Sequence, residues 1–329
     1  MTKTRRQFLG ASLGAATLAA LRPWQLEAAS ASPATRATLS RAAALPASGA
    51  DAPFDRVVFL MMENRSFDHL LGWLPGADGR QAGLAYTDTA GITYPTFRLS
   101  PDFQGCDAAD PDHSFEGGST QRNGGACDGF LKTQPVGDQF PIGYYDEADV
   151  GVRGQLARGF TVVDNYFCSI MAETYPNRFY QHCARTDRNH NDGVTQVPDP
   201  GKLPAIWDQL NKTAGGPTGN YYFSDLSFLG LFGTKYQSIS KPVSTFLAQA
   251  AAGTLPNVSF VDPSFGGEGQ GTSGDDHPRG DLRSGESFIS EIYQAVRAGP
   301  QWGKTVFVIA YDEWGGFFDH VAPPRVADE

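Results

Sequence analysis

Three continuous apolar segments, each followed by acidic residues, most constrain what this chain can fold into. Residues 56–62, 258–261 and 305–310 are almost entirely apolar, and a fourth run at residues 160–163 ends at Asp164. Runs of this kind are typical of strands that are covered on both faces in a parallel sheet. They predict an α/β fold with a mostly parallel sheet and helices on both faces.

Helical patterns occupy part of the sequence between these expected strands. Residues 66–73 form one such pattern, and residues 285–298 form a second with a clear apolar face. Ligands of parallel sheets sit at the carboxyl ends of the strands. The acids and the amide that follow the apolar runs should therefore converge, and a cation would relieve their mutual repulsion. These residues are Glu63, Asn64, Asp262, Asp312 and Glu313.

The first 50 residues predict export rather than part of the fold. Two arginines at positions 5 and 6 precede an apolar run at residues 9–21, which is too short to span a bilayer. This pattern is typical of a twin-arginine signal, so we expect residues 1–31 to be a signal peptide that engages the Tat export machinery. Residues 32–50 are rich in Ala, Ser, Pro and Thr and are interpreted as a linker. The expected destination is periplasmic, cell-wall-associated or extracellular.

The remainder, residues 51–329, is interpreted as one catalytic domain with loop-rich excursions. Residues 75–150 are rich in Gly, Asp and Pro and predict an insertion of the kind that shapes a site. Residues 214–240 are interpreted as a second excursion. Its aromatic residues, at positions 221–232, belong either to the core or to a substrate wall.

Charge and cysteine content narrow the class of protein further. The formal charge of −10 and the absence of a basic stripe exclude a nucleic-acid binder. Export permits disulfides, and of the three pairings of four cysteines we favour Cys106–Cys127 and Cys168–Cys183. No Cys-x-x-Cys pair is present, which argues against a structural zinc site.

Three sequence blocks resemble those of one enzyme superfamily. Residues 62–69 read MENRSFDH, residues 173–180 read ETYPNRFY and residues 311–324 read YDEWGGFFDHVAPP. They resemble the opening block, the nucleophile block and the late acidic block of the bacterial phospholipase C and acid phosphatase superfamily, a phosphoesterase family that includes phosphatidylcholine-type phospholipase C. Weaker matches occur at residues 112–130 and 276–278, and all five follow the family order.

The resemblance implies an alkaline-phosphatase-like fold and hydrolysis of phosphate esters. Family members continue well beyond the last block, so it also implies that the C-terminal part of the fold is missing and that the catalytic domain is incomplete. The favoured activity is phospholipase C-type cleavage of phospholipid through a phospho-threonine intermediate, with transient contact to a membrane surface. The alternatives are an acid-phosphatase-like phosphomonoesterase acting on small phosphate esters and a non-catalytic, truncated secreted protein of the same fold.

The resemblance also assigns roles to individual residues. Thr174 matches the family nucleophile, and Pro176 predicts that a helix starts there, which would favour a bound phosphate. His113 and His277 are candidates for holding phosphate oxygens or protonating the leaving alcohol. A hydroxyl nucleophile needs activation, and a divalent metal ion would supply it. The candidate metal ligands are Glu63, Asn64, Asp312 and Glu313.

Each of these residues also has an ordinary structural interpretation. Glu63, Asn64 and Thr174 could cap helices. The acids at 312–313 could end a strand in a solvated loop. Single histidines such as His113 and His277 are often structural.

Overall fold

The computed structural model describes residues 52–105, 107–186, 190–193 and 203–326. The predicted signal peptide and linker lie outside this range, so both stay predictions. In the part of the chain that is described, no helix combines the length and the apolar character needed to cross a bilayer.

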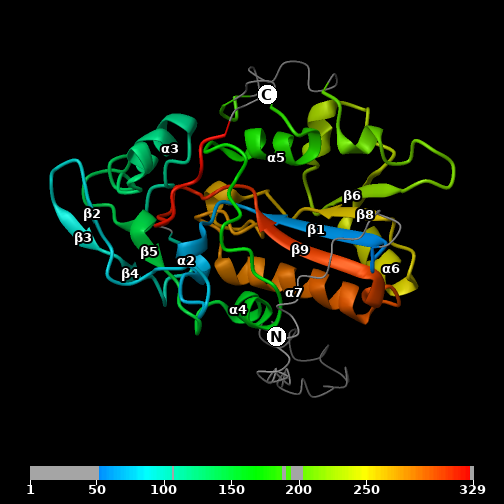
Figure 1. Cartoon of the computed structure of the whole chain (residues 1–329), viewed down its shortest axis with the longest axis horizontal. Helices are drawn as coiled ribbons and strands as arrows, with labels where there is room; N and C mark the ends of the chain where they lie inside the picture. The colour runs from blue at the N-terminus through cyan, green and yellow to red at the C-terminus, as the bar shows by residue number, and fades with distance from the viewer. Residues whose placement is uncertain (1–51, 106, 187–189, 194–202, 327–329) are drawn as a thin grey trace, which may run out of the picture. The chain divides into compact units, whose positions relative to one another are not determined.

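A five-stranded sheet forms the centre of the fold, and every pair of neighbouring strands in it is parallel. The strand order is β7-β6-β8-β1-β9 (Figure 1). This confirms the predicted α/β class with a mostly parallel sheet. The strands are β1 (Arg56–Met62), β6 (Gly219–Phe223), β7 (Ser240–Pro242), β8 (Val258–Val261) and β9 (Thr305–Tyr311).

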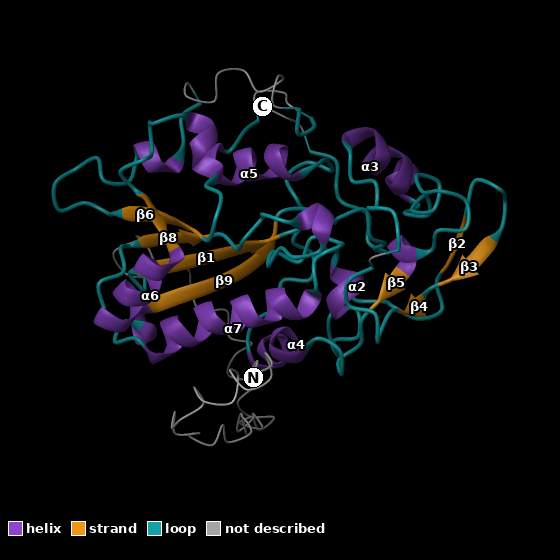
Figure 2. Cartoon of the chain, turned by 180° about the vertical axis from the view of Figure 1, so that it is seen from behind, coloured by secondary structure: helices purple, strands orange, loops and turns teal. Residues whose placement is uncertain are grey.

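Helices cover the sheet on both faces, as Figures 1 and 2 show from opposite sides. Alternate side chains of a strand point to opposite faces. Val58 and Leu60 accordingly pack with Ile289 in one core, whereas Met61 packs with Phe179 in another. The first core lies under α4 (Gly151–Gly159), α6 (Val243–Ala252) and α7 (Leu282–Ala298), and the second lies under α5 (Thr174–Cys183).

The segment between β1 and α4 adds small elements at one end of the sheet (Figure 2). It contains two two-stranded sheets, one antiparallel and one parallel. The elements are α2 (Phe67–Leu71), β2 (Ala85–Thr87), β3 (Thr93–Pro95), β4 (Phe97–Arg98), α3 (Phe115–Arg122) and β5 (Gly143–Tyr144). Short 3-10 turns complete the described fold at Asn123–Gly125, Phe140–Ile142, Ile206–Asp208, Phe228–Phe232, Glu268–Gln270 and Trp302–Lys304.

Two sequence predictions about the sheet are wrong. Residues 160–163 form no strand, and Phe160 and Val163 are 51% and 64% exposed. The position beside β8 is filled instead by β6, which lies inside the supposed excursion at residues 214–240. Tyr221 and Tyr222 of β6 are fully buried, and the aromatic residues that follow it at Phe228 and Phe232 are buried as well. They are core residues and build no substrate wall.

The predicted disulfides are also absent. Cys127, Cys168 and Cys183 are free thiols. Cys183 belongs to the core under α5, whereas Cys168 and Cys127 belong to a different cluster, which explains why Cys168 and Cys183 do not pair. Cys106 lies outside the described residues.

Candidate active site

The carboxyl ends of the neighbouring strands β1 and β9 supply the acids of the site. The pairing of these strands ends one residue before Glu63 and Asp312, which therefore leave the sheet side by side. The backbone N–H of Asn64 donates to Asp312 Oδ1 at 3.2 Å. Together with Glu313, these side chains lie in residues that are at most 3% exposed.

Tight turns hold both strand ends in contact. Asn64 adopts a left-handed backbone with φ 52°, which asparagine tolerates better than most residues. Gly315 lies against it with φ 65°, and a Cβ at this position would come within 2.0 Å of the Asn64 carbonyl oxygen. Only glycine therefore fits this position without a shift of the backbone.

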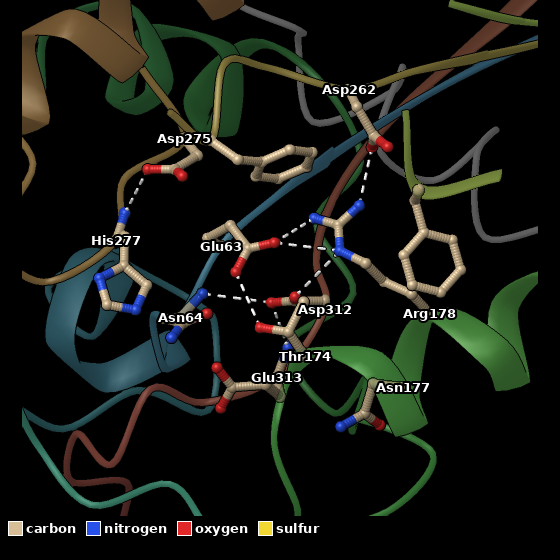
Figure 3. Close-up of polar contacts among 12 residues, drawn as sticks. Glu63, Asn64, Thr174, Asn177, Arg178, Asp262, Asp275, His277, Asp312 and Glu313 are labelled. Atoms are coloured by element: carbon tan, nitrogen blue, oxygen red, sulfur yellow. Dashed lines mark hydrogen bonds and ion pairs between the residues drawn. The ribbon is translucent and has the colours of Figure 1, made fainter. Parts of the chain in front are cut away.

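Thr174 is the first residue of α5 and faces Glu63 (Figure 3). Its hydroxyl donates to Glu63 Oε2 at 2.9 Å. Pro176 lies in the first turn, where its missing N–H costs no helical hydrogen bond. Thr174 therefore stands at the positive end of a ten-residue helix, where an anion such as a phosphate is stabilised.

Asn177 fixes the loop that leads into α5. Its amide nitrogen donates to the carbonyl oxygens of Ala172 at 2.9 Å and Glu173 at 3.2 Å. Its amide oxygen accepts the Ile170 N–H at 3.1 Å. The asparagine of the nucleophile block is thus turned toward the backbone before Thr174, and it sets where the hydroxyl stands.

Arg178 is a buried member of the site to which the sequence argument assigned no role. Its guanidinium forms ion pairs with Glu63, with Asp262 at 2.8 Å and with Asp312 at 3.3 Å. Asp262, which follows β8, therefore contacts Arg178 rather than Thr174. The available signal was the position of Arg178 in the nucleophile block, one helical turn after Thr174.

The electrostatic environment shifts the pKa values of Glu63, Asp312 and Glu313 in different directions. Burial raises the pKa of Glu63, but the charges of Arg178 and His277 and the hydrogen bonds of Asp312 and Thr174 together outweigh burial, so its pKa lies below the ordinary value. Burial and the negative charge of Glu63 hold the pKa of Asp312 well above the ordinary value. Burial likewise raises the pKa of Glu313, despite a hydrogen bond from the Gly315 N–H. Glu63 is therefore the carboxylate that is ionised first.

His113 lies beside the strand ends and contacts Asn64. The amide nitrogen of Asn64 donates to His113 Nε2 at 3.2 Å, and His113 Nδ1 donates to the carbonyl oxygen of Pro111 at 2.7 Å. In this arrangement Nδ1 is the donor and Nε2 is the acceptor, because an amide N–H can only donate and a carbonyl oxygen can only accept. Asn64 Oδ1 is left buried without a hydrogen-bond partner.

His277 lies 6.1 Å from His113 between ring centres. Its backbone N–H donates to Asp275 Oδ1 at 2.9 Å, and its Nε2 lies 3.7 Å from Asp110 Oδ2. Burial lowers its pKa, although Asp110 and Glu63 act in the opposite direction. Its Nδ1 is buried without a hydrogen-bond partner. The structure thus brings both predicted histidines to the side of the site.

Two oxygens of the site have the chemistry that a divalent cation prefers. Glu313 Oε1, like Asn64 Oδ1, is a buried oxygen without a hydrogen-bond partner, and carboxylate and amide oxygens are ligands that hard cations prefer. The carboxylates of Glu63, Asp312 and Glu313 are not all within 4.8 Å of one another. Among the described residues, Asp68, Asp319 and His320 do have possible metal-ligand atoms that all lie within 4.8 Å of one another.

That second group braces the fold beside the site. His320 Nδ1 donates to Asp68 Oδ2 at 2.6 Å, and Asp319 accepts the backbone N–H of Asp68 at 3.3 Å. Arg65 contacts His69 Nε2 at 2.9 Å and the carbonyl oxygen of Asp276 at 2.7 Å. The contacts of Asp68 join the first and last sequence blocks, and Arg65 joins the first block to residues 276–278.

Comparison with known proteins identifies the family. A model described as the Phosphoesterase family matches residues 54–211 and 205–329. This chain belongs to the Phosphoesterase family. The resemblance drawn from the sequence blocks is thereby confirmed.

The relatives are named as phospholipases C. Non-specific phospholipase C6 of Arabidopsis thaliana is 30% identical over 301 residues, which cover 83% of this chain and 56% of the relative. Phospholipase C A of Mycobacterium tuberculosis is 30% identical over 370 aligned positions, which cover 98% of this chain and 68% of the relative. Phospholipase C B of the same organism is 31% identical over 334 aligned positions, which cover 85% of this chain and 62% of the relative. The chain thus spans between about half and two thirds of the length of these relatives.

Proposed function

We propose that this chain is an exported phosphoric ester hydrolase that cleaves phospholipids in the manner of a phospholipase C. The observation that carries the proposal is the hydrogen bond from Thr174 to Glu63, made at the start of a helix and above the ends of two parallel strands. The family and its relatives support it. We further propose that the fold is alkaline-phosphatase-like, as the resemblance implies.

Thr174 acts as the nucleophile in this proposal. Glu63 Oε2 accepts its hydroxyl hydrogen and so turns an oxygen lone pair toward the space in front of α5. The Thr174 oxygen bonds to phosphorus while the bond from phosphorus to the glycerol oxygen breaks, which gives a phospho-threonine and diacylglycerol. Water then gives a hydrogen to His277 and attacks phosphorus, the bond from phosphorus to the Thr174 oxygen breaks, Glu63 returns the hydrogen to that oxygen, and the phosphorylated head group is released.

His277 and His113 have different roles in this proposal. We assign protonation of the leaving alcohol to His277, because its Nδ1 has no partner and lies in a buried site. His113 holds the amide of Asn64. A direct contact of His113 with phosphate stays a prediction.

A divalent metal ion is the proposed cofactor. Glu63, Asn64, Asp312 and Glu313 would hold it, since two of them carry buried oxygens without partners. When bound, it would polarise the phosphate and lower the pKa of the nucleophile.

The proposed substrate is a phospholipid at a membrane surface, and the proposed route to it is export by the Tat machinery. Three exposed apolar residues, Phe160, Val163 and Tyr166, lie on the segment that leads to Thr174 and support transient contact with lipid.

The test is hydrolysis by the purified chain of p-nitrophenyl phosphorylcholine, p-nitrophenyl phosphate and phosphatidylcholine vesicles. Release of diacylglycerol from the vesicles is the expected result. Turnover of p-nitrophenyl phosphate alone would favour the phosphomonoesterase. No turnover of any of them with added Zn²⁺, Mn²⁺ or Ca²⁺ would contradict the proposal.

A further inference from the structure

The guanidinium of Arg178 lies across the carboxyl ends of three adjacent strands (Figure 3). Its Nε is 3.0 Å from Glu63 Oε1 after β1, and its Nη1 is 2.8 Å from Asp262 Oδ1 after β8. The same Nε is 3.3 Å from Asp312 Oδ2 after β9. The side chain is 1% exposed, and its guanidinium carbon lies 4.8 Å from the ring centre of Phe265.

Two residues in one turn of α5 bind the two carboxylate oxygens of Glu63. Thr174 and Arg178 are four residues apart, so they project from one face of the helix. Thr174 donates to Glu63 Oε2, and Arg178 donates to Glu63 Oε1. The orientation of the Glu63 carboxylate is therefore fixed by the helix that also carries the hydroxyl.

We propose that Arg178 is a positioning residue that aligns the Glu63 and Asp312 carboxylates for the cation and for Thr174. The inference rests on the proposed function, because it names what sets the geometry of that same site. Arg178 itself is buried among acids and does not touch the substrate.

Asp262 anchors this arrangement from the other side. Its Oδ2 accepts the hydroxyl of Tyr221, and that hydroxyl accepts the backbone N–H of Phe228 at 3.0 Å. Asp262 is fully buried and bound on both oxygens, so it fixes Arg178 relative to β6 and β8. Because Asp262 holds the guanidinium of Arg178 at the end of β8, the ion pairs of Arg178 with Glu63 and Asp312 fix the positions of these two carboxylates.

A planar guanidinium is needed for this task. Arginine presents five donors in a rigid fork, whereas lysine offers one flexible ammonium group. Lysine at position 178 would keep the positive charge but could not bind Glu63, Asp262 and Asp312 with fixed geometry. Arg178→Lys therefore separates alignment from charge compensation.

The experiment compares the full chain carrying Arg178→Lys with the wild type. Zn²⁺, Mn²⁺ and Ca²⁺ are each titrated by calorimetry, and kcat and KM are measured on p-nitrophenyl phosphorylcholine. We expect the affinity for the cation that binds the wild type most tightly to fall by about 10-fold or more. We also expect kcat to fall by about 10-fold or more while KM stays within about threefold. The control is Arg158→Lys, since Arg158 forms an exposed ion pair with Glu147.

A second variant keeps the test decisive if Arg178→Lys does not fold. Asp262→Asn keeps the shape of the anchor and removes its charge, so it should loosen Arg178 and weaken cation binding in the same direction. A folded Arg178→Lys chain with wild-type cation affinity would overturn the inference, and so would a wild type that binds none of the three cations. If the wild type binds a cation but hydrolyses no ester, the proposed function fails and the calorimetry still decides the role of Arg178.

Discussion

Removal of the Thr174 hydroxyl should separate catalysis from stability. In Thr174→Ala, Glu63 Oε2 loses its donor and phosphorus loses its nucleophile. Loss of a nucleophile that acts with its neighbours as a unit lowers kcat by at least about 10³-fold. A partly buried hydrogen bond to an ionised acceptor contributes about 1.5–3 kcal/mol, which corresponds to a fall in Tm of about 3–12 °C for a large domain.

The assay for this prediction is turnover of p-nitrophenyl phosphorylcholine beside thermal unfolding followed by circular dichroism. Thr174→Ser keeps the hydroxyl and should retain measurable turnover. Thr120→Ala is the matched control, because the Thr120 hydroxyl donates to a backbone carbonyl oxygen on the exposed helix α3. Wild-type turnover in a folded Thr174→Ala chain would remove Thr174 from the mechanism.

Three further predictions concern the cation, pH and the turn at Gly315. Dialysis against EDTA should lower turnover and Tm together, and re-addition of the divalent cation should restore both; unchanged values would exclude a cation. Burial and the charges of Glu173 and Glu63 raise the pKa of Asp192 to about 7, despite a hydrogen bond from the Tyr175 N–H. The folded chain then holds a proton that the unfolded chain loses near pH 4, so the free energy of unfolding should fall as pH rises from about 4 to about 7. Asp192→Asn should flatten that part of the curve in urea unfolding, and an unchanged slope would contradict the assignment. Gly315→Ala should lower the free energy of unfolding by about 1–3 kcal/mol or more and reduce turnover. The control is Gly137→Ala, because Gly137 also has a positive φ but has open space around the added Cβ. Equal losses of stability in the two variants would refute the close-contact argument.

The strands that the sequence predicted well are those with continuous apolar runs. β1 and β8 lie inside the sheet and have the expected bounds, whereas β9 is an edge strand of mostly half-buried residues and extends one residue further than expected. β6 was missed because its residues, Gly219–Phe223, are mostly aromatic and polar and follow a glycine-rich stretch. Aromatic residues favour strands, so the signal was present but was interpreted as a loop.

Residues of the site were predictable where a motif and a strand end coincided. Glu63 and Asp312 each follow an apolar run, and Thr174 stands before a proline that favours a helix start. The role of Arg178 was not predictable in the same way, because its partners lie 84–134 residues away along the chain and no local period reports on such pairs. The apolar run at 160–163 was misleading because composition alone cannot tell an exposed segment from a buried one.

The order of the strands has a consequence for synthesis. β1 is made first among the strands of the main sheet, yet both of its partners, β8 and β9, come last. Asn64 and Asp312 are 248 positions apart, which at about 5–20 residues per second leaves β1 without its neighbours for about ten seconds or more on the ribosome. During that interval its apolar edge needs protection by a chaperone or by transient non-native contacts. A nascent chain arrested before residue 305 therefore exposes an aggregation-prone strand and lacks Asp312 and Glu313, and the arrival of β9 supplies the second neighbour of β1 together with both acids.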